Sequence, residues 1–289
     1  MRWTVPSSLE YFALLVGDDS HFPLTEAAVS IAQSEHPALD LQSVLGEIDT
    51  LAERLLVRLP RDASALHRVK LLHRYFFEEL GFAGNVNDYY STANSYVHEV
   101  LRTRRGIPIS LAVIYLELAH RVGLGATGVS FPGHFLVKLR LPLGDAVIDP
   151  MTGTSLSREA LLGQIEPYLQ RAGAGAAGVG LEDRGLAAFL GPAAPREIVA
   201  RMLRNLEAIH RAAKDWPQLL AVQQRLVILQ PRDWDWRRDR GLTYAQLGQT
   251  DAAIDDLTGY LRHARNAADR ASIAARLQAL RASGPPRWH

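Results

Sequence analysis

Apolar residues recur at steps of three and four over two stretches of the chain, residues 7–80 and 196–280. Because an α-helix turns once in 3.6 residues, this spacing predicts amphipathic helices in both stretches. Between them, short apolar runs bounded by turn formers predict three strands, at residues 126–131, 134–140 and 145–149. The turn LPLG joins the last two strands into a hairpin. We therefore expect an α+β fold, with a small antiparallel sheet between two helical regions.

Residues 108–122 differ from the other predicted helices because they are apolar nearly all round. Such a helix is expected to lie buried in the core, and Pro108 suits its first turn. At 100° per residue, Ser110, Glu117 and Arg121 fall within about 40° of one another. They form one polar stripe on a buried helix, so each of them needs a polar partner.

The predicted hairpin brings a histidine and an aspartate onto one face of the sheet. If Arg140 pairs with Asp145, His134 and Asp149 become diagonal neighbours about 7–8 Å apart at the backbone, and their side chains can meet. A slip of one residue would separate them. The pair has two interpretations. It is either a catalytic base with the carboxylate that orients it, or a hydrogen bond that ties two strands together.

Composition narrows the possible functions. The net charge is +1, with 16 basic and 21 acidic residues up to position 190 and 16 and 10 beyond it, which gives no case for nucleic-acid binding. No run reaches 18 uncharged apolar residues and no signal peptide is recognisable, so we expect a cytoplasmic protein without a membrane span. The ten histidines lack metal-ligand spacing and no cofactor motif occurs, so we expect neither metal nor cofactor.

A weak internal repeat of 34 residues lies within the second helical stretch. Gly241, Tyr244, Gly248 and Ala253 stand at spacings of three, four and five, and a shift of 34 places Lys214–Asp215 at the equivalent turn. The pattern resembles tetratricopeptide repeats, whose stacked helix pairs form a groove for a peptide or a partner helix. The alternative is an ordinary helical hairpin that supports the preceding domain.

Two polar segments precede the buried helix and are candidates for ligand contacts. The segment NVNDYYSTANSY at residues 85–96 holds two adjacent tyrosines and several amides. It either lines a cleft or forms a turn whose side chains bond their own backbone. Arg104 and Arg105 either bind an anion at the start of the helix or pair with Glu99 or Glu117.

The order of these motifs resembles the transglutaminase-like (papain-like) core: a helix, a strand that begins with His, and a strand that ends with Asp-Pro. In that family a cysteine at the start of the helix is the nucleophile, the histidine is its base, and the aspartate orients the histidine. His134 and Asp149 match the family's histidine and aspartate. The cysteine position falls at Pro108, and the chain contains no cysteine.

The nearest hydroxyl to that position is Ser110, two residues further on and about 200° round the helix. It is either a nucleophile activated by His134 or a small polar residue that bonds back to the backbone. A third possibility keeps His134 and Asp149 as an acid–base pair for a reaction without a covalent step.

Four segments resemble the bacterial SirB-type proteins, which are transglutaminase-like with C-terminal tetratricopeptide repeats: NVNDYYSTANSYVHEVL, RTRRGIPISLAVIYLELAHRVGL, FPGHFLVKL and VIDP. The resemblance covers nearly the whole chain and implies a regulatory or protein-interaction role. The division it implies is a helical N-terminal region at 1–84, a transglutaminase-like core at 85–170 packed with it as one domain, a loosely ordered Gly/Ala-rich connector at 171–195 and repeat helices at 196–289.

Together these features predict a pseudoenzyme, a catalytically silent scaffold that binds a protein or peptide through the cleft and the repeat groove. The candidate catalytic residues, retained from the enzymatic family, are His134, Asp149 and Ser110. The candidate binding residues are Asn85, Asp88, Tyr89, Tyr90, Asn94, Ser95, Arg104, Arg105 and Tyr244. The alternative is a hydrolase or acyltransferase that uses Ser110, or a water activated by His134, with Asp149 as the orienter.

Overall fold

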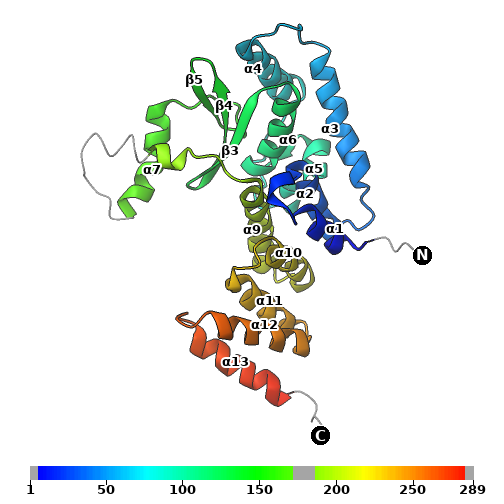
Figure 1. Ribbon diagram of the computed structural model, residues 1–289, viewed down its shortest axis with the longest axis vertical. Coiled ribbons are helices and arrows are strands. Elements are labelled where there is room, and N and C mark those ends of the chain that lie inside the picture. Colours follow the sequence, from blue (N-terminus) through cyan, green and yellow to red (C-terminus); the bar gives the residue numbers. More distant parts are fainter. Residues whose placement is uncertain (1–5, 172–185, 284–289) are drawn as a thin grey trace.

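The computed structural model describes residues 6–171 and 186–283. Figure 1 shows a broad upper part, in which helices pack around a small sheet, and a narrower column of helices that continues from it to the C-terminus. This architecture confirms the predicted α+β fold. It also places the two predicted binding regions, the sheet and the repeat helices, in different parts of the molecule.

Helices make up the N-terminal region, as the apolar spacing predicts. In order they are α1 (Ser8–Leu15), η1 (Asp19–His21), α2 (Leu24–Ser30), η2 (Ile31–Ser34), α3 (Leu41–Leu56), α4 (Ala65–His73) and the π-helical η3 (Arg74–Glu79). Ser7 and Glu10 form a capping box at the start of α1, and Asp40 caps α3. Gly81, with a φ of 71°, takes the left-handed conformation that ends this region.

The helix α6 (Pro108–Arg121) lies in the core, after η4 (Thr92–Ser95) and α5 (Val97–Thr103). Its residues 108–116 are all buried, as its apolar sequence predicts. In its polar stripe, Glu117 pairs with Arg121 at 2.8 Å and accepts a hydrogen bond from Thr25 at 2.6 Å. Arg121 also pairs with Asp49 on α3 at 2.6 Å. The end of the stripe thus finds its partners on α2 and α3.

The sheet has the strand order β3 (Gly125–Phe131), β4 (His134–Leu141) and β5 (Gly144–Ile148), all antiparallel, and a separate parallel pair joins β1 (Ala83–Gly84) to β2 (Arg105–Gly106). Arg140 pairs with Asp145, which confirms the predicted hairpin register. Because side chains alternate between faces, Phe135 lies in the main core and Leu136 lies in a second cluster with α7 (Arg158–Arg171).

The predicted connector at residues 171–195 is only partly loose. Residues 172–185 lie outside the described residues. The part after them is held against the sheet, because Leu186 is buried in the cluster with α7 and the Ala193 amide donates to the Gly128 carbonyl at 2.8 Å. The prediction of a loose connector is therefore wrong for the described part. The Gly/Ala-rich composition conceals a few apolar residues that pack.

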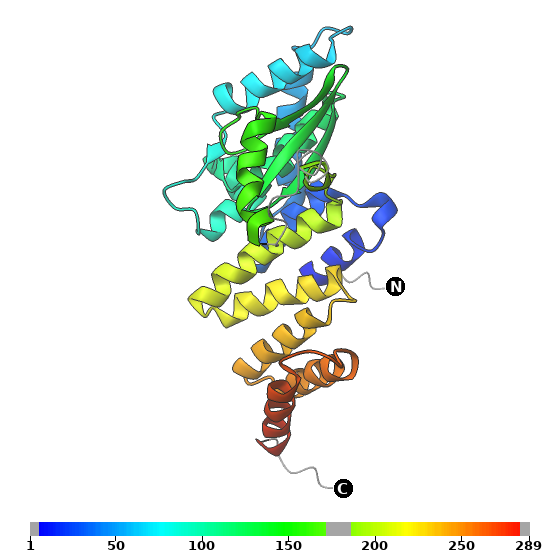
Figure 2. The same ribbon diagram turned by 90° about the vertical axis from the view of Figure 1, so that its left-hand side faces the viewer.

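Five helices complete the chain: α9 (Pro195–Ala213), α10 (Trp216–Leu229), α11 (Trp234–Gln246), α12 (Thr250–His263) and α13 (Arg270–Ser283). Lys214 and Gly248, 34 residues apart, have φ values of 56° and 71° at the two equivalent turns. This confirms the turn predicted at Lys214–Asp215. Figure 2 shows the helices following one another down the column as stacked layers, as expected for helical repeats.

Two apolar clusters divide this column between α10 and α11. Leu203 of α9 and Leu226 of α10 belong to the same cluster as the N-terminal helices and α6. Leu257 of α12 and Leu277 of α13 belong to a separate cluster with α11. The first helix pair is thus part of the main core, although the sequence assigned residues 196–289 to one unit.

Arg196, at the start of α9, fastens the repeat helices to the N-terminus. Its Nε donates to Asp19 Oδ1 at 2.7 Å, its Nη2 to the Val16 carbonyl at 2.5 Å, and its Nη1 to the Leu229 carbonyl at 2.6 Å. One guanidinium group therefore joins three segments that are distant in the sequence. Two of its acceptors are carbonyls at or near helix ends, which helices leave unsatisfied.

Candidate functional site

His134 begins β4 and Asp149 follows β5, and their side chains meet on the face of the sheet that packs against α7. His134 Nε2 lies 3.0 Å from Asp149 Oδ1, with side chains 22% and 16% exposed. The contact that the hairpin register predicted is therefore present. Because Nε2 faces the carboxylate, Nδ1 is the nitrogen that can exchange a proton with a ligand.

The turn after β5 fixes Asp149 in place. Asp149 Oδ1 accepts a hydrogen bond from the Met151 amide at 2.8 Å, and the Asp149 amide donates to the Thr154 carbonyl at 2.9 Å. Burial raises the pKa of the Asp149 carboxyl, but His134 and the Met151 amide outweigh burial and hold that pKa below its ordinary value. Asp149 is therefore a carboxylate at neutral pH, as a histidine-orienting group requires.

The β1–β2 pair links this carboxylate to the start of α6. The Gly84 amide donates to the Met151 carbonyl at 2.9 Å, and the Asn85 amide donates to the Gly106 carbonyl at 3.0 Å. A Cβ on Gly84 would overlap the Met151 side chain, so this approach requires glycine. The helix start, the histidine and the aspartate are thus connected, with Pro108 at the helix start and no cysteine in the chain.

Ser110 does not join the pair. Its side chain is fully buried, and its hydroxyl donates to the Asn94 carbonyl at 2.6 Å and accepts from the Ile107 amide at 3.2 Å. Within the described parts of the chain, no hydrogen bond connects it to His134. The geometry corrects the nucleophile hypothesis, because the hydroxyl is used to bond the backbone at the start of α6.

The amides of the polar segment 85–96 hold the segment together. Asn85 Nδ2 donates to Asn94 Oδ1 at 3.0 Å, and Asn94 Nδ2 donates to the Asp88 carbonyl at 2.5 Å. The Asp88 amide in turn donates to Asn85 Oδ1 at 3.3 Å. Asn94 and Ser95 are buried. These four residues match the interpretation as a self-bonded turn.

The two tyrosines of the same segment remain at the surface. Tyr89 is 42% exposed and Tyr90 is 79% exposed, and their ring centroids lie 5.4 Å apart, edge to face. The amide network fixes the backbone that carries them. They are therefore available to a ligand, whereas the amides beside them are not.

Arg104 and Arg105 have structural partners that the sequence did not indicate. Arg104 ends α5 with a φ of 59°, its Nη2 lies 3.5 Å from Glu47 Oε1, and its guanidinium stacks on the Phe82 ring at 4.7 Å. Arg105 Nη1 donates to the Gly81 carbonyl at 2.6 Å. Both the anion clamp and the two predicted acidic partners are corrected, because these groups join α5 to α3 and to the turn after η3.

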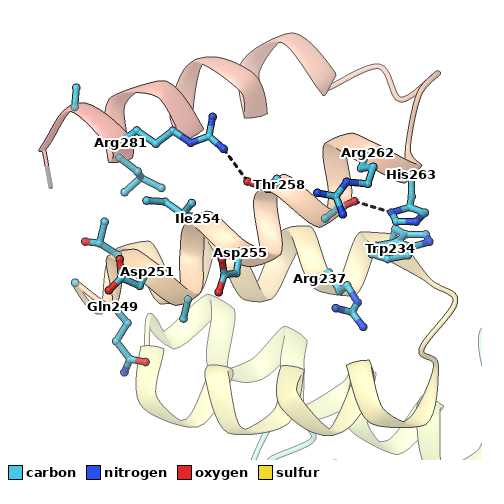
Figure 3. Close-up of a pocket in the computed structure, with 16 residues that line it drawn as sticks. Trp234, Arg237, Gln249, Asp251, Ile254, Asp255, Thr258, Arg262, His263 and Arg281 are labelled. Carbon is cyan, nitrogen blue, oxygen red and sulfur yellow. Dashed lines mark hydrogen bonds between the residues drawn. The ribbon is translucent and has the colours of Figure 1, made fainter. Parts of the chain in front are cut away.

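A groove of about 1740 Å³ lies among α11, α12 and α13. Figure 3 shows Trp234 stacked on His263 at one end of it and Arg281 at the other. The stacked rings lie 3.7 Å apart, and Arg281 Nη2 donates to Thr258 Oγ1 at 3.1 Å. Charged residues of both signs line it: Arg237, Asp251, Asp255, Arg262 and Arg281.

Tyr244, predicted to bind in this groove, is not among the residues that line it. Its hydroxyl accepts a hydrogen bond from Gln224 Nε2 of α10 at 3.2 Å, and the Arg240 guanidinium lies 5.7 Å from its ring centroid. Tyr244 therefore joins the two helix pairs. The prediction failed because the sequence repeat identifies a packing position as readily as a binding one.

One cationic side chain near the hairpin was not predicted. Arg201 Nη1, from α9, donates to the carbonyl of Phe131, the residue that pairs with His134, at 3.4 Å. In the sequence, Arg201 is one polar position on an amphipathic helix. No local signal could have shown that α9 packs against the hairpin, since that contact is made between distant segments.

Two further features were examined over the described residues, 6–171 and 186–283. Within them, no group of three or more His, Cys, Asp or Glu side chains could hold a metal ion. None of the helices in these ranges is both long enough and apolar enough to cross a membrane.

Two family profiles match consecutive parts of the chain. The profile of the transglutaminase-like superfamily matches residues 42–204, and a tetratricopeptide repeat profile matches residues 206–278. The first match contains the sheet, α6 and most of α9. The second begins within α9 and includes the groove of Figure 3.

Related proteins cover most of the chain. A UPF0162 protein from Xylella fastidiosa (strain 9a5c) is 38% identical over 255 residues, which span 86% of this chain and 87% of that protein. A UPF0162 protein from Pseudomonas aeruginosa is 35% identical over 81% of this chain and 82% of its own length. F-box only protein 21 from Homo sapiens is 30% identical over 44% of this chain and 24% of its own length. No solved structure matches the chain.

Proposed function

Because this chain belongs to the transglutaminase-like superfamily and contains no cysteine, we propose that it is a catalytically silent scaffold that binds a protein or peptide. We assign it to the SirB-type branch and to a regulatory role in the bacterial cytoplasm, on the motifs between residues 85 and 150. Its binding surfaces are the cleft at His134 and Asp149 and the groove of the repeat helices.

One observation carries this proposal: the base and its orienter are kept while the nucleophile is missing. His134 and Asp149 lie 3.0 Å apart in the geometry of a catalytic pair, yet a thiol is absent from the chain and Ser110 is sealed in the core. Acyl transfer through a covalent intermediate needs a nucleophile within hydrogen-bond reach of its base. What remains is a shaped cleft beside a tetratricopeptide repeat region, and such repeats present grooves to peptides and partner helices.

A second candidate function is hydrolysis by a water that His134 activates. The observation in its favour is that the pair is partly exposed, at 22% and 16% of its side chains. A base needs only its substrate proton or one water within about 3 Å, without a covalent step. Asp149, held ionised, would keep His134 in the tautomer that accepts a proton on Nδ1.

Binding is tested with photocrosslinking residues placed at the two surfaces in the full chain. Benzoylphenylalanine replaces Tyr90 near the cleft or Ile254 in the groove, and Leu143 serves as the control because it is fully exposed at the far turn of the hairpin. We expect a discrete cross-linked protein from Tyr90 or Ile254 and none from Leu143. The same adduct from all three positions, or from Leu143 alone, would contradict the proposal.

Catalytic silence is tested separately with ester and amide substrates, together with a fluorophosphonate probe and intact mass. We expect neither turnover nor an adduct. Turnover that disappears in His134→Ala and persists in Arg140→Gln, an exposed substitution on the same strand, would establish the hydrolytic function instead. An adduct that requires Ser110 would contradict the burial described above.

A further inference from the structure

The turn that carries His134 is enclosed by groups from three other segments. Phe131 and His134 pair at the end of the β3–β4 hairpin, and Gly133 between them has a φ of 70°. A Cβ on Gly133 would overlap the hydroxyl of Tyr168, so this α7 side chain lies directly against the turn. Figure 2 shows α7 across the sheet with α9 below it.

Arg201 of α9 reaches the same turn from the opposite side of the sheet. Its Nη1 donates to the Phe131 carbonyl at a long 3.4 Å, and its guanidinium carbon lies 5.6 Å from the Phe135 ring centroid. The side chain is partly buried. A guanidinium group has five N–H donors, so one long hydrogen bond leaves most of them free for another acceptor.

The positive charge at this turn is not balanced. Arg204 lies one turn further along α9, and in the described parts of the chain neither arginine forms an ion pair with a carboxylate. Burial, and then the repulsion by Arg204, lower the pKa of Arg201, while Tyr89 and Tyr168 are its remaining electrostatic neighbours. Two arginines without a counter-ion, bordered by two phenols, are costly in a partly buried place.

Other arginines of the repeat helices are paired, which makes this site an exception. Arg196 pairs with Asp19 at 2.7 Å, Arg211 with Asp239 at 3.1 Å, and Arg240 with Asp256 at 2.7 Å. The missing partner of Arg201 is therefore not a general property of these helices. It is confined to the end of the hairpin that carries His134.

We propose that Arg201 and Arg204, with Tyr89 and Tyr168, form a subsite for an oxyanion, the carboxylate or phosphate of a peptide bound in the cleft at His134. This rests on the proposed function, since it gives the chemical class of the ligand for that cleft. An oxyanion accepts charge-assisted, bidentate hydrogen bonds from a guanidinium group. Binding it would remove the repulsion between the two arginines. It would also place the adjoining peptide backbone beside His134.

The test follows the arginine Nε–Hε resonances of the full chain by NMR, with the Arg201 resonance assigned from Arg201→Lys. Four N-acetyl tripeptides are the probes: trialanine with a free C-terminus, Ala-Glu-Ala amide, Ala-phosphoserine-Ala amide and trialanine amide. We expect the three charged peptides to shift the Arg201 resonance in a saturable way and the uncharged amide to leave it unchanged. The strongest of the three identifies the terminal carboxylate, the side-chain carboxylate or the phosphate as the source.

Variants connect the shift to the subsite. Arg201→Gln and, independently, Arg204→Gln should weaken binding at least about tenfold, which corresponds to ~1.4 kcal/mol, whereas the exposed Arg140→Gln should bind like the parent chain. Two Arg→Gln variants are used because Arg204 is the less constrained of the pair. Unchanged affinity in both would overturn the proposal.

The same titration separates this inference from the proposed function. If all four peptides, including the uncharged amide, shift the His134 ring resonances but not that of Arg201, the cleft binds peptides and the oxyanion subsite is wrong. If the uncharged amide shifts Arg201 as strongly as the charged peptides do, the subsite is also wrong. No saturable shift at either residue would overturn both the subsite and the peptide cleft.

Discussion

The two helix pairs of the repeat region share one backbone plan but have opposite surroundings. In each pair a residue with positive φ, Lys214 or Gly248, makes the turn between the helices. The pair α9–α10 is buried in the main core, whereas α11 and α12 form a separate cluster with α13 and leave an open groove. A repeat unit can therefore serve as core or as binding surface, according to the residues on its faces.

Buried polar contacts show how the first pair was adapted to the core. His210 Nε2 of α9 lies 3.1 Å from Glu35 Oε1 of η2, and both His210 and Arg225 are almost completely buried. In the second pair, by contrast, the bidentate contact of Arg240 with Asp256 stays within the pair. The first copy matches the repeat pattern poorly because its residues must satisfy partners outside the repeat.

The largest expected effect comes from truncation. Removing residues 195–289 would uncover the apolar faces of α1, α2 and α6 that α9 and α10 cover, so we expect loss of the cooperative fold. Removing residues 233–289 should leave the main cluster and a cooperative transition. Near-ultraviolet circular dichroism during thermal unfolding distinguishes the two outcomes. A chain ending at 232 that lacks fixed tertiary structure would show that the two clusters are not separate.

Single cavities should sharpen the same contrast. Leu203→Ala in α9 and Leu257→Ala in α12 each empty a fully buried position and should each cost about 2–5 kcal/mol. The first should lower the free energy of unfolding of the whole protein. The second should raise hydrogen exchange only in α11–α13. Faster exchange throughout the chain in Leu257→Ala would contradict two separate cooperative units.

Acid should loosen the first pair through Glu35. The contact with His210 outweighs burial and holds the pKa of Glu35 below its ordinary value of 4.5. A carboxyl with a lowered pKa stabilises the fold above its ordinary pKa, and this contribution is lost as pH falls through the folded value. Glu35→Gln should therefore cost about 1–3 kcal/mol at neutral pH and flatten the loss of stability below pH 4.5.

Urea unfolding of the Glu35→Gln chain at neutral and acid pH measures this, with the exposed Glu53→Gln as the matched control on α3. If Glu53→Gln changes the pH dependence as much as Glu35→Gln does, the effect reflects net charge and not the contact with His210.

The smallest effect is expected within the second pair. Arg240→Lys keeps the charge opposite Asp256 but loses the two-pronged hydrogen bond, so it should cost about 1 kcal/mol. Because the contact lies inside the second pair, hydrogen exchange should rise in α11 and α12 and not in α9. A fall in the stability of the main core would show that the two pairs are coupled.

Local rules predicted the hairpin and the turns of the repeat, but not the environment of the site. The turn LPLG fixes the register that pairs Arg140 with Asp145, and that register alone brings His134 to Asp149. The contact could thus be derived from residues 134–149. The second turn was predictable for the same reason, since a 34-residue repeat conserves its own backbone geometry.

Contacts between distant segments were not predictable. Ser110 bonds to Asn94, and Arg104 lies beside Glu47, across separations that no periodicity specifies. The polar stripe on α6 showed that Ser110 needed a partner but not which one. Arg201 is the clearest case, because its role depends on α9 packing against the sheet, a contact between elements about 70 residues apart.

The guanidinium of Arg196 also sets the timing of folding during synthesis. Its partners Asp19 and Val16 precede it by 177 and 180 residues. At about 5–20 residues per second, the ribosome needs roughly 10 to 35 s to reach Arg196 after Asp19, and longer to supply Leu229. Throughout that interval α1 and α2 lack the helices that cover them. The nascent chain therefore carries uncovered apolar faces until nearly four-fifths of it has been made, and it depends during that time on slow association or on a chaperone.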